Sequence, residues 1–216
     1  SNVGGGDVII SNAGNTAAGQ GITVSGPISA AGAGAGITIA SGSPLTISAN
    51  LTSAAGILLT ASESAATGDD LTVNSVVTLE STGSSVELRA GDNILVAAGS
   101  TIKAATTITM TADFNDVDAT GANVVVAGAL VAPSALITVD PAANDNDTFT
   151  ITPSVGAPIT VDAEDGTDTL NFIADGLAVT ILGNVITAAG RAPLTFLNFE
   201  FVNIINTNGG GSITLN

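Results

Sequence analysis

Acidic residues crowd one long stretch of this 216-residue chain. No Lys or Arg lies between Lys103 and Arg191, yet this interval holds 11 of the 19 acidic residues. Carboxylates at this density repel one another unless water or a cation screens them. Calcium is the natural cation, because it accepts carboxylate, amide and backbone carbonyl oxygens in a flexible geometry. The stretch therefore predicts calcium as the one cofactor of this chain.

Three loops supply the candidate calcium ligands. The loops at residues 142–149 and 163–170 each end in Asp-Thr followed by an apolar residue, and a third acidic loop spans residues 113–118. The predicted ligands are Asp145, Asp147, Asp165, Asp168, Asp113, Asp116 and Asp118. The alternative is that these side chains form Asx turns and stay solvated.

The first two loops resemble the calcium-binding nonapeptide repeat of secreted RTX proteins, in which GGxGxDx precedes a large apolar residue. The likeness is degraded, because Ala142-Ala143 and Ala163-Glu164 replace the paired glycines and only Gly166 keeps the third glycine. The resemblance implies that Asp145, Asp147, Asp165 and Asp168 are metal ligands.

Very short apolar segments must position these loops. Three-residue units with apolar ends, such as VEL at 86–88, ILV at 94–96 and ITM at 108–110, alternate with corners rich in Gly, Ala, Ser and Asn. Such units are too short for helices and read as strands that point alternate residues inward. Ile37, Ile57 and Val77 recur every 20 residues, which is a plausible coil length. The pattern predicts an all-β protein built as a β-solenoid, similar to a parallel β-helix.

Composition and the lengths of the expected strands divide the chain into three parts. Residues 1–6 are predicted to be a flexible arm, residues 7–112 the solenoid coils, and residues 113–216 an acidic part with longer strands and all 6 Phe. The last part either continues the solenoid or forms a separate sheet, and a β-sandwich is the second choice of fold. The apolar segment 122–139 contains Asn123, Gly128 and Pro133, so it favours strand, turn and strand over a membrane-spanning helix.

Composition excludes several classes of function. The formal net charge of -16 repels phosphate backbones and anionic lipid, so neither nucleic acid nor membrane insertion is expected. The absence of Cys and His removes disulfides, thiolate chemistry and imidazole bases. The three basic residues are scattered, and no Trp or Tyr offers a platform for sugar stacking. We therefore expect no enzyme, with a polysaccharide-degrading β-helix as a remote alternative.

Two sets of motifs resemble known families. AGDNI at 90–94 and AGSTI at 98–102 resemble the repeats of secreted bacterial hemagglutinin-like adhesins, while NDTF at 146–149 and FEFVNI at 199–204 resemble modules of very large bacterial surface proteins. The resemblance implies an extracellular or cell-surface protein. The leading expectation is a structural protein that associates with itself through strand edges to form a filament, surface layer or adhesin stalk. The rival expectation is an adhesive module that binds a glycan or a host surface.

Overall fold

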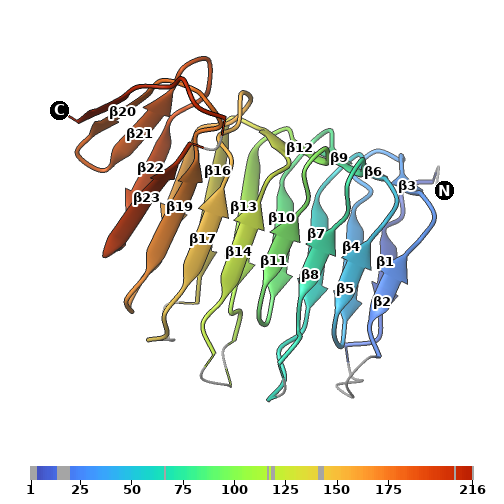
Figure 1. Cartoon of the computed structure of the whole chain (residues 1–216). Helices are drawn as coiled ribbons and strands as arrows, with labels where there is room; N and C mark the ends of the chain where they lie inside the picture. The colour runs from blue at the N-terminus through green and yellow to red at the C-terminus, as the bar shows by residue number, and fades with distance from the viewer. Residues whose placement is uncertain are drawn as a thin grey trace.

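Strands form about 49% of the computed structural model, which contains no helix. It describes the chain except for residues 1–3, 14–19, 66, 116, 118, 119, 141–143, 207 and 216. Parallel sheets stack as a β-solenoid of about 5 turns, and Figure 1 shows the coils side by side from the N-terminal to the C-terminal end. The predicted all-β solenoid is confirmed.

Three sheets run along the stack. The first sheet contains β1 (Val8–Ser11), β4 (Ile37–Ser41), β7 (Ile57–Ala61), β10 (Val86–Ala90), β13 (Thr107–Ala112), β16 (Ser134–Val139), β18 (Ile159–Asp162), β22 (Leu194–Leu197), β21 (Val185–Ala188), β20 (Val179–Leu182) and β24 (Ile213–Leu215). The second sheet contains β2 (Ile22–Val24), β5 (Leu45–Ile47), β8 (Leu71–Val73), β11 (Ile94–Val96), β14 (Asn123–Val126), β17 (Thr148–Ile151), β19 (Thr169–Ile173) and β23 (Phe201–Ile205). The third sheet contains β3 (Ile28–Ala30), β6 (Leu51–Ser53), β9 (Thr78–Ser81), β12 (Thr101–Ala104) and β15 (Ala129–Val131).

The core consists of apolar columns that run along the stack. In β5, Leu45 and Ile47 are fully buried and Thr46 between them faces outward. Leu45 pairs in register with Leu71, and Leu71 with Ile94, so each inward side chain lies on its counterpart one coil away. Neighbouring strands are about 4.8 Å apart, which is close enough for these side chains to pack. Burying one such side chain contributes about 1.5–3 kcal/mol, and this repeated burial stabilises the stack.

The coil length varies more than the sequence suggested. Ile37 and Ile57 do pair in register. The next partner of Ile57 is Val86, 29 residues later, rather than Val77. Val77 precedes β9 in the third sheet, where its carbonyl accepts a hydrogen bond from Thr101 N–H. The 20-residue period is therefore wrong beyond one coil, because the corner loops have different lengths.

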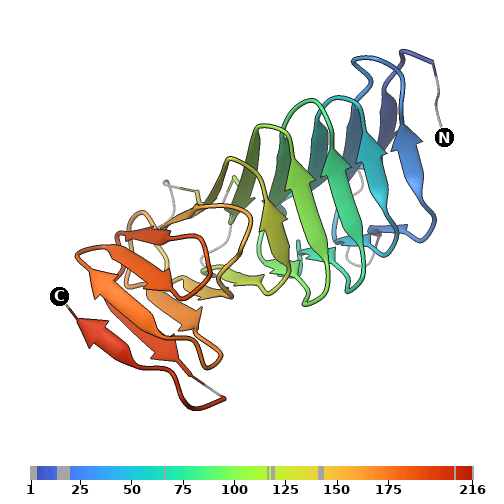
Figure 2. The ribbon, with the colours of Figure 1, turned by 90° about the horizontal axis from the view of Figure 1, so that it is seen from above.

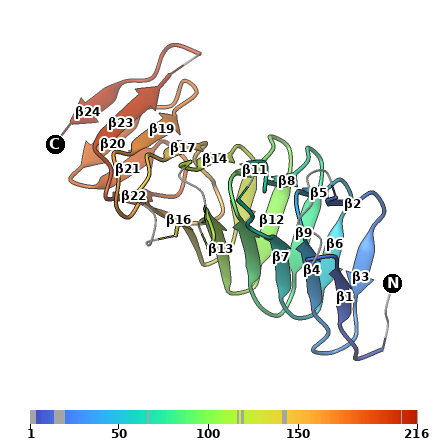
Figure 3. The same cartoon turned by 90° about the horizontal axis from the view of Figure 1, so that it is seen from below.

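Parallel pairing continues through the acidic part of the chain. β13 pairs with β16 and β14 with β17, and both sheets then extend to β22 and β23. The third sheet stops at β15, after which one isolated bridge joins Val131 to Gly156. Figure 3 shows this sheet confined to the N-terminal part of the stack. Phe149 and Phe172 are fully buried in the part that lacks a third sheet, and Phe149 packs edge to face on Phe199 with ring centroids 5.2 Å apart.

A hairpin interrupts the coils near the C-terminal end. β20 and β21 are antiparallel, β21 is antiparallel to β22, and β24 lies parallel to β20 (Figure 2). Residues 194–205 form two strands, β22 and β23, because Asn198 turns the chain with φ of 59°. The apolar segment 122–139 contains three strands, β14 to β16, rather than two. Within the described residues, no helix has the length and apolar character needed to cross a membrane.

We expect Phe172→Ala to lower the free energy of unfolding by about 3–5 kcal/mol, because it empties a fully buried position. Phe201→Ala is the matched control, since that ring is 55% exposed and its loss should change stability by under about 1 kcal/mol. Urea denaturation of both variants checks this. Equal losses would contradict a core filled by Phe172.

Candidate functional site

A column of acidic residues lies at the inner corner where the chain enters the second sheet. Each member stands two residues before the first inward-facing apolar residue of its strand, so it points to the same side as the core. Strand register places the members one above the other in successive coils. We call this set the acidic column: Asp69, Asp92, Asp147, Asp168 and Glu200, with Ala122 between Asp92 and Asp147.

Carboxylates of the acidic column accept hydrogen bonds from the backbone of the preceding coil. Ala122 N–H donates to Asp147 Oδ1 at 2.6 Å, and Asp147 N–H donates to Asp168 Oδ1 at 2.7 Å. Asp168 N–H donates to Glu200 Oε2 at 2.7 Å. Asp69 N–H donates to Asp92 Oδ2 at 2.8 Å in the same sense. The carboxylates of Asp92, Asp147, Asp168 and Glu200 thus each satisfy a corner N–H just before the regular ladder of the sheet begins.

Asp168 is the member whose ionisation is clearly perturbed. Its side chain is fully buried, and burial raises the pKa above 3.8. The hydrogen bond from Asp147 N–H lowers the pKa and the negative charge of Glu200 raises it, so burial prevails. Oδ2 of Asp168 is buried and has no hydrogen-bond partner among the described residues. The Asp168 charge therefore destabilises the fold at neutral pH, while its hydrogen bond supports the corner.

The structure stacks the two loops that resemble the RTX repeat. Thr167 N–H donates to Asn146 Oδ1 at 3.0 Å, from one coil to the next. Gly166 has φ of 152°, and a Cβ at this position would lie 2.0 Å from the Asp145 carbonyl oxygen. Gly166 therefore permits close approach of the two loops.

The predicted calcium ligands do not meet at one point. Asp147 and Asp168 are buried in the acidic column, whereas Asp145 is partly exposed and Asp165 is exposed in the loops before them. Asp113 is buried but is not a member of the acidic column, and its φ is 55°. Its N–H donates a hydrogen bond to the Asp92 carbonyl at 3.1 Å. Asp116 and Asp118 lie outside the described residues. Within the described part of the chain, no group of three or more acidic side chains is arranged to hold a metal ion. Calcium binding stays a prediction.

The N-terminal half contributes acids that sequence reasoning missed. Asp69 and Asp92 belong to the acidic column, and Glu63 lies against Gly91, where a Cβ would come within 2.2 Å of Glu63 Oε2. The sequence does contain a signal for these two members of the column, because Asp69 and Asp92 each stand two residues before a strand triplet, at 71–73 and 94–96. Both residues lie outside the stretch between Lys103 and Arg191 that lacks basic residues, so the acidity of that stretch does not point to them.

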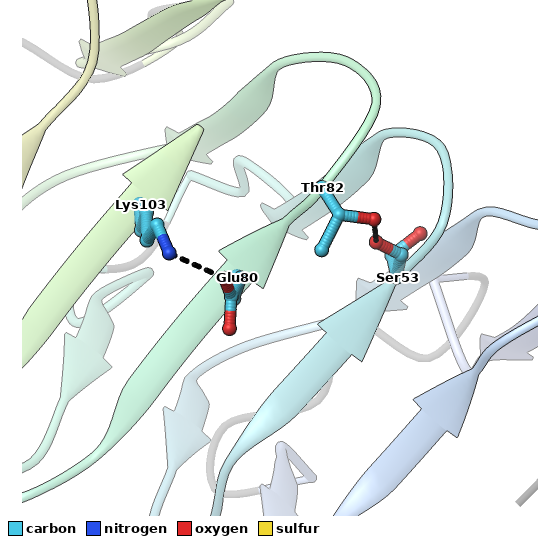
Figure 4. Close-up of polar contacts among 4 residues, drawn as sticks. All are labelled: Ser53, Glu80, Thr82 and Lys103. Carbon is cyan, nitrogen blue, oxygen red and sulfur yellow. Dashed lines mark hydrogen bonds and ion pairs between the residues drawn. The ribbon is translucent and has the colours of Figure 1, made fainter. Parts of the chain in front are cut away.

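Polar contacts on the outer faces also join neighbouring coils. Lys103 Nζ lies 2.7 Å from Glu80 Oε1, and Thr82 Oγ1 donates to the Ser53 carbonyl at 3.2 Å (Figure 4). Exposed ion pairs of this kind contribute about 0–1 kcal/mol. Lys103 and Glu80 therefore add little to the stability of the stack.

The N-terminal coil is the least covered layer of the core. Val8, Ile10, Ile22 and Ile28 are only partly buried, although their partners in the next coil, Ile37, Ile39, Leu45 and Leu51, are at most 1% exposed. In the described chain, β1, β2 and β3 each pair on one side only. This coil thus presents three open strand edges and an uncovered apolar layer.

Pockets on the surface of the described residues include the following two. One, of about 320 Å³, is lined by Ser100, Ser154 and Arg191 among others and contains no carboxylate. The other, of about 220 Å³, lies on the outer face of the second sheet and is lined by Asp70, Thr72, Asn93, Ile94, Leu95, Asn123 and Val125. Neither pocket contains the pair of carboxylates that glycoside hydrolysis uses.

Comparison with protein-family models, curated proteins and solved structures finds no match. The resemblance to adhesin repeats therefore stays an expectation from the sequence, and the geometry of the chain itself supports the functional proposals.

We expect Asp168→Asn to become more stable relative to the unsubstituted protein as the pH rises. A carboxyl whose pKa is raised by folding favours the folded state at acidic pH, and that contribution is lost as the pH rises through the folded pKa. The amide keeps an oxygen for Asp147 N–H but carries no buried charge. Urea denaturation at about pH 3, below the ordinary pKa of Asp, and at about pH 7 measures this difference.

Two further variants separate the hydrogen bond from the charge. Asp168→Ala leaves Asp147 N–H buried without its acceptor, so it should cost about 1–3 kcal/mol. Asp165→Asn, which removes an exposed carboxylate from a neighbouring loop, is the control and should change stability by under about 0.5 kcal/mol. A pH profile for Asp168→Asn parallel to that of the unsubstituted protein would count against a buried charge at this position.

Proposed function

We propose that this chain is an extracellular structural protein whose solenoids join end to end into a filament, surface layer or adhesin stalk. The N-terminal coil carries the proposal, because no strand among the described residues pairs with its outer edges and its apolar layer is only partly buried. An open edge presents unpaired N–H and C=O groups that another strand can pair with. Joining unlike ends of identical subunits repeats without closing, and so produces fibres.

Composition supports the same proposal. The core is built mainly from Val, Ile, Leu and Ala, and the chain has only 3% aromatic residues, which suits thin stacked coils. The net charge of -16 keeps the sides of the solenoids apart, while β1, β2 and β3 at the open end contain no charged residue. Lateral repulsion combined with uncharged ends favours growth along the solenoid axis.

Ile9→Pro should abolish assembly without unfolding the coil. Val8 N–H and Asn12 N–H donate toward β4, so the N–H of Ile9 faces the open edge. Proline removes that donor and is tolerated on edge strands. Ile9→Thr is the matched control, because it removes the exposed apolar side chain but keeps the N–H.

Negative-stain microscopy and sedimentation velocity over a range of concentrations provide the readout. Filaments or oligomers from the unsubstituted chain and from Ile9→Thr, with monomers from Ile9→Pro, are the expected result. A chain that stays monomeric at high concentration, with or without calcium, would overturn the proposal.

Calcium as a stabilising ligand of the stacked loops is a second part of the proposal. Asp145 and Asp165 precede the acidic column in adjacent coils and keep solvent access. Calcium also accepts carbonyl, amide and water oxygens, so it does not require three carboxylates.

Added calcium should raise the thermal midpoint, and chelator should reverse the shift. The double variant Asp145→Asn and Asp165→Asn should lose the response, while Asp7→Asn, at the other end of the chain, should keep it. Differential scanning calorimetry provides the measurement. An unchanged midpoint removes calcium from the proposal and leaves end-to-end assembly intact.

An adhesive glycan-binding module is the rival function. The pocket of about 220 Å³ favours it, because side chains from three successive coils converge there around Leu95, which is 39% exposed. Asn93 Nδ2 donates to Asp70 Oδ1 at 2.7 Å, so the polar wall is already ordered. A glycan bound by monomers on an array, and lost in Asn93→Ala, would favour this function over assembly.

A further inference from the structure

The two outermost strands of the first sheet, β1 and β24, are unprotected edges. Each pairs on one side only within the described chain, and neither contains a charged residue or Pro. Ile9 is 71% exposed in β1, while Ile213 and Leu215 in β24 are 50% and 76% exposed. Soluble proteins usually shield such edges with charges, Pro or bulges. Figure 3 places the two strands at opposite ends of the molecule.

The two edge strands run in the same direction. All pairs from β1 to β22 in this sheet are parallel, and β22 is antiparallel to β21, which is antiparallel to β20. These two reversals restore the original direction, and β24 is parallel to β20. Pairing β24 of one copy with β1 of another in parallel would therefore repeat the geometry of the coils.

The free hydrogen-bonding groups of the two strands also match. Val179 N–H donates to the Ser212 carbonyl, so Ser212 and Thr214 face β20, while Ile213 and Leu215 face the open edge. On β1 the N–H and C=O of Ile9 face the open edge. With Thr214 opposite Ile9, Ile9 N–H reaches the Ile213 carbonyl, and Leu215 N–H reaches the Ile9 carbonyl.

The same register keeps the core face continuous. Leu194, Ile186, Ile181 and Leu215 follow one another across the sheet, and the first two are buried. Leu215 therefore lies on the core side of the sheet. Thr214 opposite Ile9 sets Ile213 beside Val8 and Leu215 beside Ile10, so two exposed and two partly buried apolar side chains cover each other. No acid is placed against another acid, because the partner of Asp7 is Ser212.

We propose that β24 of one copy pairs in parallel with β1 of the next copy, with Thr214 opposite Ile9, and so extends the first sheet from subunit to subunit. The inference rests on the proposed end-to-end assembly and names the contact that forms it. The occupant of each edge is a second copy of this chain.

The test introduces Ile9→Cys and Thr214→Cys together, in a chain that has no natural cysteine. Both side chains point outward, and paired Cα atoms in neighbouring strands are within the 4.4–6.8 Å range, about one strand spacing, that a disulfide spans. Mild oxidation should convert the assembled protein into a covalent ladder on non-reducing gels, and reduction should abolish it. Each single variant should produce no ladder, because it can form at most dimers.

A second pair distinguishes this contact from another end-to-end contact. Thr23→Cys with Asn203→Cys reports pairing of β2 with β23, the open edges of the second sheet. A ladder from this pair alone, or filaments that cross-link with neither pair, would overturn the β24–β1 contact while assembly stands. Monomers at all concentrations would overturn both. Val76→Cys with Thr214→Cys, which pairs an exposed position away from the sheet edges with β24, controls for random collision.

Discussion

In-register parallel pairing between successive coils is the constraint on which the rest of this structure depends. Each strand is only three to six residues long, so no strand could bury its apolar residues alone. Stacking places like residues on like, as Ile37 on Ile57 and Leu45 on Leu71, and converts isolated triplets into continuous columns. The loops between strands can then vary in length, because register is set by pairing rather than by a fixed period.

The same stacking brings buried carboxylates close together, and hydrogen bonds at the corner offset part of the unfavourable energy. A parallel stack places equivalent positions of successive coils above one another, so the side chains of Asp147 and Asp168 become neighbours in the interior. Both accept backbone N–H groups of the preceding coil, and these bonds offset part of the cost of burial. The offset is incomplete at Asp168, where burial raises the pKa and the Glu200 charge adds to the effect. The acidic column thus joins coils at a corner where the sheet ladder has not yet begun.

A one-dimensional stack also has two ends, and here they differ. The N-terminal coil leaves three parallel edges, whereas the C-terminal hairpin turns the first sheet through two reversals before β24. Val179 and Ile186 of the hairpin are buried, so this end of the core is partly covered. The proposed head-to-tail contact uses these unlike ends and their matching strand direction, whereas a closed dimer would require a surface complementary to itself.

Local patterns were sufficient to predict the class of fold. Triplets such as LTV at 71–73 and ITM at 108–110 are too short for helices, and alternation fixed which residues face the core. Coil length was not predictable, because Val77 and Val86 are equally good local partners for Ile57 and only the three-sheet geometry selects Val86. The sequence predicted the loops at 144–147 and 164–168 as acidic loops. It did not predict that they stack, because their stacking depends on pairing of β17 with β19.

The sequence by itself determined that this protein is an acidic stack of short strands with a largely aliphatic core, since these follow from composition and period-2 alternation. Only the tertiary structure decided which acids share a column, because Asp69 and Asp168 are about 100 residues apart in the chain and meet the same corner through coil register. It also decided that β24, whose ITL pattern is that of a buried coil strand, lies exposed at an edge. That outcome depends on the hairpin β20–β21, whose reversals no local pattern reveals.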